Sequence, residues 1–378
     1  MNYQLTDRDR QWAEDTYKKI KTKIKAECER VGSRIPYIAE DGVYREDKSQ
    51  TDIAWWTNGF WPGILWQMYH AEKDEGFKET AREVEAKLDR ALHEYTGLHH
   101  DVGFMWLHSA VADYRLTKDM QSRARGLHAA NLLAGRYNPR GKFIRSWNED
   151  LAGWVIVDSM MNIPLLYWAK EETGDPRFAY IAMDHADTVM NITVRGDGSC
   201  NHVIVLDPAT GELMENPGGQ GYGSGSSWSR GQAWAVYGFA LSYRHTGKKD
   251  YLDTAKQVAS YFLSQTDRTG HLALVDFRAP KEPVYWDSTA GVCAACGMLE
   301  IAGCVPEAER NFYVDGALDI LKATDERFCD WDPARDSIVQ MGTGAYHSEK
   351  DRHVPIIYGD YFFIEAVLRL LDKAFLIW

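Results

Sequence analysis

The first thirty residues carry apolar side chains at the spacing of a helix. These side chains recur at steps of three or four residues, at Ala13, Tyr17, Ile20, Ile24, Cys28 and Val31. Such spacing places them in one stripe along an α-helix. Thr6 precedes the stripe and has Asp9 three residues further on, as expected for a helix N-cap. The pattern predicts an amphipathic helix that begins next to Thr6.

The same period continues along the rest of the chain. It predicts further helices over residues 58–71, 77–94, 102–117, 120–136, 154–171, 177–192, 229–246, 251–264, 287–303, 307–328 and 359–373. Segments 64–77, 165–178 and 239–251 share one arrangement, in which an apolar helix, a short polar turn and an amphipathic helix follow one another. This alternation predicts an inner ring of apolar helices surrounded by an outer ring of amphipathic ones.

The connections between these helices alternate in length. Turns after the apolar helices take a few residues, whereas the segments before them are long, at 32–57, 137–153, 193–228, 265–286 and 329–358. The sequence therefore predicts an all-α fold, an (α/α)6 barrel of six helix hairpins, that forms a single domain over residues 1–378. The long loops gather at one mouth, where functional residues are expected. Residues 202–211 predict a short β-hairpin in one of these loops.

Composition narrows the function. Asp and Glu outnumber Lys and Arg by 12, which argues against a broad nucleic-acid surface. No apolar window is long enough for a membrane span, and the N-terminus lacks the apolar core of a signal peptide. We therefore expect a cytoplasmic protein with free thiols and no membrane partner. The 14 Trp and 20 Tyr residues favour a saccharide ligand, since sugar faces stack on aromatic rings.

Two carboxylates stand out as candidates for chemistry. Asp158 lies in the otherwise apolar segment 154–161, where a carboxylate is costly unless it is paired or hydrogen bonded. Apolar surroundings favour its protonated form and make it a candidate general acid, the alternative being a buried structural aspartate. Asp101 opens an apolar helix and is equally consistent with a simple N-cap. The adjacent His99 and His100 raise the idea of a metal site, but no third ligand is apparent, so we expect neither metal nor cofactor.

Other polar residues fall in the long loops or at the starts of apolar helices. Arg230 lies on an apolar helix and needs an anionic partner, which a substrate carboxylate would supply. The preceding glycine-rich segment, 218–227, matches no nucleotide-binding motif and predicts a flexible loop over the mouth. Cys293 and Cys296 are interpreted as small buried residues. Segment 346–350 is either a polar loop or a cluster of donors at the mouth.

Taken together, these segments resemble the unsaturated glucuronyl hydrolases of glycoside hydrolase family 88. The matching stretches run in order from about residue 36 to the C-terminus, at 56–61, 99–104, 156–158, 202, 220–221, 228–234 and 358–361. The related unsaturated rhamnogalacturonyl hydrolases share the barrel. However, the His-His-Asp and Ser-Arg-Gly-Gln-Ala-Trp stretches of this sequence fit family 88 better.

The resemblance implies a hydrolase that acts on the oligosaccharides left by polysaccharide lyases, such as glycosaminoglycan disaccharides. It would remove the Δ4,5-unsaturated uronic acid at the non-reducing end by hydrating the vinyl ether, without a metal or an organic cofactor. By position, Asp158 is the general acid/base and Asp101 the second essential carboxylate. A negative charge on Asp101 favours the protonated form of Asp158. The sugar site would be lined by Trp56, His100, Trp147, His202, Gln220, Trp228, Arg230, Trp234 and Tyr346.

One departure from the resemblance concerns sulfate. Family members that favour sulfated substrates carry an Arg before the Gln-Gly pair and a Ser-x-x-Ser-x-Lys pattern near the C-terminus. Here Gly219 and Ala345 replace that Arg and the first Ser, while Ser348 and Lys350 match the pattern. The resemblance therefore implies only a partial sulfate pocket, which argues against a strong preference for 6-sulfated chondroitin or heparin disaccharides.

Two other functions remain possible on the same barrel. A sugar epimerase or isomerase would use histidines for proton transfer, and His99, His100 and His202 are available for this. A non-catalytic sugar-binding protein would use the Trp-rich mouth alone. Asp158 argues against this last alternative, because a lectin has no need of a proton donor on an apolar helix.

Overall fold

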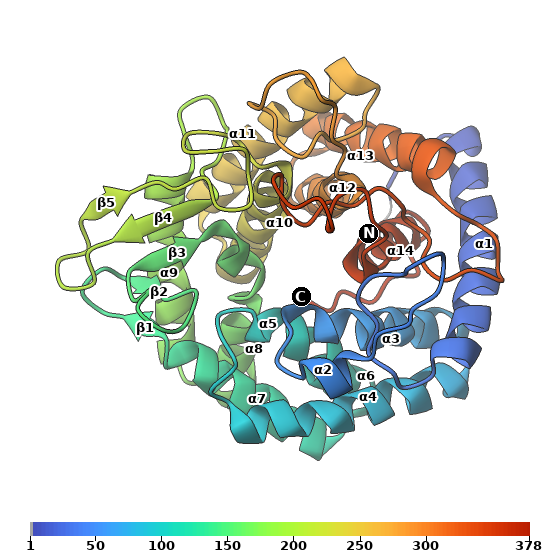
Figure 1. Ribbon diagram of the computed structural model, residues 1–378, viewed down its shortest axis with the longest axis horizontal. Helices are drawn as coiled ribbons and strands as arrows, with labels where there is room; N and C mark the ends of the chain where they lie inside the picture. The colour runs from blue at the N-terminus through green and yellow to red at the C-terminus, as the bar shows by residue number, and fades with distance from the viewer. Residues whose placement is uncertain (1–2) are drawn as a thin grey trace.

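A computed structural model describes residues 3–378 and shows two concentric rings of helices (Figure 1). The inner ring contains α3 (Phe60–Glu72), α5 (Val102–Trp106), α6 (Ala112–Thr117), α8 (Pro164–Thr173), α10 (Ser229–Thr246), α12 (Ser288–Cys304) and α14 (Ile357–Leu370). The outer ring contains α1 (Asp7–Val31), α4 (Glu75–Glu94), α7 (Met120–Ala134), α9 (Arg177–Thr193), α11 (Lys249–Thr266) and α13 (Glu307–Phe328). The predicted all-α barrel is confirmed.

The two rings differ in how their helices bury apolar side chains. In α1 the stripe that includes Ala13, Ile20 and Ile24 is buried, and the backbone N–H of Asp9 donates to the Thr6 hydroxyl at 3.2 Å. In α12 every residue from Ser288 to Ala302 is buried, because an inner helix packs both outward and toward the barrel axis. No helix within residues 3–378 combines the length and apolarity that a bilayer span requires.

The inner-helix prediction over 154–171 is wrong at its start. Trp154–Ile156 form strand β3, Val157–Met161 form a 3₁₀ helix (η3), and α8 begins only at Pro164. The apolar β-branched residues of β3 pair antiparallel with β4 (Val203–Leu206), which in turn pairs with β5 (Leu213–Glu215). The predicted hairpin is thus confirmed as β4–β5, and β3 is its unforeseen third strand.

Short elements complete the loops and the inner ring. The predicted helix 102–117 is interrupted by a π-helical turn, η2 (Leu107–Val111), between α5 and α6. The loop after α7 contains the strand pair β1 (Tyr137–Asn138) and β2 (Phe143–Ile144). The remaining short helices are α2 (Lys48–Thr51), η1 (Trp56–Gly59) and η4 (Asp267–Thr269).

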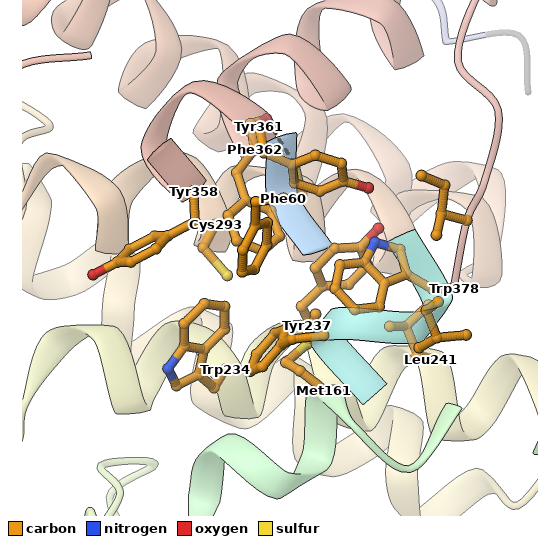
Figure 2. Close-up of a cluster of buried hydrophobic side chains, with 14 of the residues drawn as sticks. Phe60, Met161, Trp234, Tyr237, Leu241, Cys293, Tyr358, Tyr361, Phe362 and Trp378 are labelled. Carbon is orange, nitrogen blue, oxygen red and sulfur yellow. Dashed lines mark hydrogen bonds between the residues drawn. The ribbon is translucent and has the colours of Figure 1, made fainter. Parts of the chain in front are cut away.

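The segment after α14 closes the barrel at the C-terminal ends of the inner helices. Gln67 on α3 holds it by donating to the Phe375 carbonyl at 2.6 Å and accepting from the Phe375 N–H at 3.0 Å. Trp378 lies parallel to the ring of Phe362 and donates through Nε1 to Glu365 at 3.0 Å. Figure 2 shows this buried aromatic plug, which we define as Phe60, Trp234, Tyr358, Tyr361, Phe362 and Trp378. The plug fills the barrel axis and leaves the other end as the mouth.

Candidate active site

A cavity of about 260 Å³ lies at the N-terminal ends of the inner helices. It brings together eight of the residues predicted from the sequence, namely Trp56, His100, Asp101, Trp147, Asp158, Gln220, Trp228 and Arg230. Trp55, His99 and Ile156 complete its wall and had not been assigned to the sugar site. Three of the five predicted long loops, 32–57, 137–153 and 193–228, therefore converge with the starts of inner helices on one polar and aromatic cavity.

The other predicted site residues lie around this cavity. His202 lies behind Asp158, and Trp234 lies fully buried in the aromatic plug, with its ring centroid 5.2 Å from that of Phe104. Tyr346 donates its backbone N–H to the Gln220 carbonyl at 2.9 Å, which places the loop 344–353 next to the cavity.

The two candidate sulfate ligands lie in that neighbouring loop. Ser348 donates its hydroxyl to Asp351 at 2.6 Å, and Lys350 is exposed. Neither residue belongs to the cavity wall.

Asp101 is held by neighbours from two segments. It occupies the N-cap position of α5, but its side chain makes no capping bond. Its Oδ1 accepts from Asn162 Nδ2 at 2.8 Å, and its Oδ2 lies 3.3 Å from His99 Nδ1 and 3.4 Å from His100 Nε2. Burial acts to raise the pKa of Asp101, but His100, His99 and Asn162 outweigh it, and the pKa is lowered. These contacts therefore favour the ionised form of Asp101 at the cavity wall.

The histidines beside Asp101 form the only cluster in residues 3–378 with the composition and spacing of a metal site. One ligand atom from each of His99, His100 and Asp101 lies within 4.8 Å of the others. The sequence did not indicate a third group beside the two histidines, and the structure places the Asp101 carboxylate there. Burial lowers the pKa of His100 to about 4, so its ring is neutral near neutral pH. Contact with the Asp101 carboxylate accounts for the position of both imidazoles.

Asp158 follows β3 and differs from Asp101 in its surroundings. Within residues 3–378 its Oδ1 accepts no hydrogen bond. Among the basic side chains of residues 3–378, only His202 comes within 4 Å of it, with 3.6 Å between its Nε2 and Asp158 Oδ1. The Gln220 N–H donates to His202 Nδ1 at 3.0 Å, so Nδ1 is the acceptor and Nε2 is the ring nitrogen that can donate toward Asp158.

The small sheet sets the positions of Asp158 and His202. Ile156 pairs with Val203, and the Val157 N–H donates to the His202 carbonyl at 3.1 Å. Ser146 ties this sheet to the Asp101 segment, because it accepts from the His100 N–H at 3.1 Å and, through its hydroxyl, from the Ile156 N–H at 2.9 Å. These backbone hydrogen bonds thus fix the segments that carry Asp101 and Asp158 relative to each other.

Arg230 already has an anionic partner within the chain. Its Nη1 donates to Asp287 at 3.0 Å and to the Thr343 carbonyl at 2.5 Å, and its Nη2 donates to the Gly344 carbonyl at 2.7 Å. The guanidinium also lies 4.4 Å from the ring centroid of Trp228. The sequence did not reveal Asp287, because it precedes α12 and accepts from the Thr289 N–H as an ordinary N-cap does. A substrate carboxylate is therefore not needed to compensate this charge.

Comparisons with known proteins extend over nearly the whole chain. The profile of the family described as Glycosyl Hydrolase Family 88 matches residues 28–244. An unsaturated glucuronyl hydrolase of Bacillus sp. (strain GL1) is 36% identical over 348 residues, which are 90% of this chain and 91% of that protein. An unsaturated chondroitin disaccharide hydrolase of Streptococcus pneumoniae is 34% identical over 345 residues, 85% of this chain and 83% of that protein. The crystal structure of an unsaturated glucuronyl hydrolase from Streptococcus agalactiae superposes with a TM-score of 0.90 at 30% identity, covering 99% of this chain and 94% of that one.

Proposed function

The chain belongs to glycosyl hydrolase family 88, and from this premise we propose that it removes the Δ4,5-unsaturated uronic acid from the non-reducing end of lyase-generated oligosaccharides. Relatives that match most of the chain are named for unsaturated glucuronyl and chondroitin disaccharide substrates. A small cavity with tryptophans in its wall suits a sugar ring with one charged group. Glycosaminoglycan-type disaccharides are therefore the proposed substrate class.

The difference between the two carboxylates supports a hydration mechanism. Asp101 accepts a hydrogen bond from Asn162 and has a lowered pKa, whereas Asp158 Oδ1 accepts no hydrogen bond within residues 3–378. A group that must give up a proton and later recover one is best left without fixed partners, while a group that stabilises positive charge is best held ionised. We therefore assign the proton transfers to Asp158 and the electrostatic role to Asp101.

The proposed reaction begins with protonation of the vinyl ether. Asp158 gives its proton to C4 of the C4=C5 bond, and the ring oxygen shares the positive charge that develops at C5. The Asp101 carboxylate stabilises this oxocarbenium-like state. Water then adds to C5 and passes a proton to the Asp158 carboxylate, which restores the acid. The hemiketal formed at C5 opens, and the sugar remainder leaves C1 as an alcohol.

Several residues of the cavity wall are proposed to hold the sugar in place for this reaction. Trp56, Trp147 and Trp228 offer ring faces, while His100 and Gln220 offer polar groups. His202 Nε2–H faces Asp158 and orients it when the carboxylate is charged.

Residues beside the cavity are proposed to serve the remainder of the substrate. Tyr346, Ser348 and Lys350 lie in the loop next to Gln220, where the sugar on the reducing side would pass. Trp234 supports the cavity from the aromatic plug beneath. A cytoplasmic location is also proposed, because all six cysteines lie within the described residues and are unpaired.

Ultraviolet absorbance of the unsaturated uronic acid tests the function directly. A panel of disaccharides from chondroitin, hyaluronan, heparin, gellan and pectin should show loss of the C4=C5 chromophore for the glycosaminoglycan-type members. An epimerase or a lectin would leave the absorbance unchanged, and a rhamnogalacturonyl hydrolase would act on the pectin product alone. Hydration also predicts that kcat is insensitive to the leaving group, since the bond at C1 breaks only after water has added. A steep dependence of kcat on leaving-group acidity would exclude this mechanism.

A further inference from the structure

We propose that Asn162 is a positioning residue for the hydration reaction, which aims Asp101 into the cavity and fixes it relative to Asp158. This proposal rests on the function proposed above. Asn162 is fully buried and immediately follows η3, the short helix that carries Asp158. It lies 61 residues from Asp101 in the sequence, and no motif drew attention to it.

The side-chain amide of Asn162 connects both carboxylate segments. Its Nδ2 donates to Asp101 Oδ1 at 2.8 Å and to the Asp158 carbonyl at 3.2 Å. Its Oδ1 accepts from the Phe104 N–H at 2.7 Å. A backbone N–H can only donate, so the oxygen of the amide must face Phe104 and the NH₂ group must face Asp101. Both donors of the amide and one of its acceptor sites are thereby used.

The contact with Phe104 explains why Asp101 is free to act. A helix N-cap aspartate ordinarily accepts a hydrogen bond from the second or third N–H of its own helix. In α5 the third N–H is that of Phe104, and Asn162 accepts it instead of Asp101. A cap supplied from a distant segment therefore leaves the Asp101 carboxylate available to the cavity.

The packing around Gly103 shows how closely the two segments approach. A Cβ atom at Gly103 would lie 2.4 Å from the Cα and 2.7 Å from the Oδ1 of Asn162. Only a residue without a side chain permits this contact. The backbone at the start of α5 thus packs directly against Asn162, and this packing restrains the position of the amide that contacts Asp101.

The decisive variant is Asn162→Asp, which replaces the NH₂ donor by oxygen at nearly constant shape. At low pH the new carboxyl and Asp101 share one proton, so the hydrogen bond and the single negative charge are kept. As the pH rises the shared proton is lost, and the two carboxylates then repel each other. In the parent the Nδ2 of Asn162 and the Oδ1 of Asp101 are only 2.8 Å apart. We expect kcat to match the parent at the acid end and to fall about ten- to a hundredfold below it with rising pH, with a smaller change in KM.

A second variant, Asn162→Ala, gives a different signature. Without the amide donor Asp101 holds its proton more strongly, so the acid limb of the kcat profile should move to higher pH. Asn162→Ser provides a milder change with a small hydroxyl donor, and it should lie between Asn162→Ala and the parent. These comparisons use only folded enzyme and do not depend on any single variant being stable.

Gln67 offers a matched control at the closed end of the barrel. It is a fully buried amide that bonds the backbone of Phe375, and Gln67→Glu makes the same change of amide to carboxylate. This control should lower thermal stability while its kcat profile stays parallel to that of the parent. A parallel profile in Asn162→Asp, or an unmoved acid limb in Asn162→Ala, would overturn the proposal. If the parent itself left the chromophore intact, the proposed function would fail instead.

Discussion

The buried pair of Arg230 and Asp287 permits a prediction that separates structural support from substrate binding. The side chain of Arg230 is 1% exposed and that of Asp287 is fully buried, with 3.0 Å between Nη1 and Oδ2. Removing one partner of such a pair leaves an uncompensated buried charge and costs about 3–5 kcal/mol. Arg230→Met should therefore lower the free energy of unfolding by about that amount. The carbonyls of Thr343 and Gly344 also lose their donor.

The double variant Arg230→Met/Asp287→Asn isolates the charge. It leaves no unpaired carboxylate, so it should be more stable than Arg230→Met by about 1–3 kcal/mol, although still weaker than the parent. In this double variant a change in KM reflects the loss of an Arg230 contact with the substrate rather than the loss of folding stability. If Arg230 donates to the uronate, KM should remain about tenfold or more above the parent, the value of one charge-assisted hydrogen bond.

The measurements are urea unfolding followed by tryptophan fluorescence, and KM from loss of the substrate chromophore. Similar denaturant slopes would show that the variants unfold from comparable states. The reasoning is refuted if Arg230→Met loses less than about 1 kcal/mol, or if removing Asp287 as well destabilises the protein further. A parental KM in the double variant would assign Arg230 to structure alone.

Three further predictions follow from the site and the core. Asp158→Asn should keep substrate binding but lower kcat by about 10²–10⁴-fold, since an amide cannot exchange the proton, and activity within tenfold of the parent would contradict the assignment. Unsulfated chondroitin disaccharides should have a kcat/KM at least equal to that of the 6-sulfated ones. A tenfold preference of the parent for the 6-sulfated form would contradict this and would point to a cation other than the missing Arg in the sulfate pocket. Gly219→Arg should lower kcat/KM for both the unsulfated and the 6-sulfated disaccharides, because φ at Gly219 is +58° and a Cβ there would lie 2.2 Å from His202 Nδ1. Burial lowers the pKa of His108 and of His185 to about 3, so the unfolded chain takes up protons first as pH falls below about 6.5. Stability is then lost toward acid at about 1.4 kcal/mol per pH unit for each histidine, and His185→Gln should reduce this slope in urea titrations across pH.

The barrel was predictable because its helices carry strong local signals. Residues 229–246 were predicted as a helix and form α10 over the same range, and Thr6 caps α1 as its position indicated. The start of the segment at 154 was not predictable in this way. A run of Trp, Val and Ile is compatible with a buried strand or a buried helix, and only pairing with β4 decides between them.

The candidate site was predictable where residue type alone was unusual for its surroundings. Asp158 and Arg230 are charged residues in apolar segments, and both line the cavity. Asp287 and Asn162 carry no such signal, because each is an ordinary residue near a helix boundary. Their partners lie 57 and 61 residues away in sequence, so their roles depend on the tertiary fold.

The aromatic plug determines the order in which products can depart. Phe362 and Trp378 are buried and stacked beneath the cavity, so in residues 3–378 they block the barrel axis toward its closed end. If the uronic acid binds beside Asp158 as proposed, the remainder of the saccharide lies between it and the mouth of the barrel. In the proposed reaction we therefore expect the saccharide to leave first and the keto acid second. With that order of release, the uronic acid product should compete directly with the next substrate for the free enzyme.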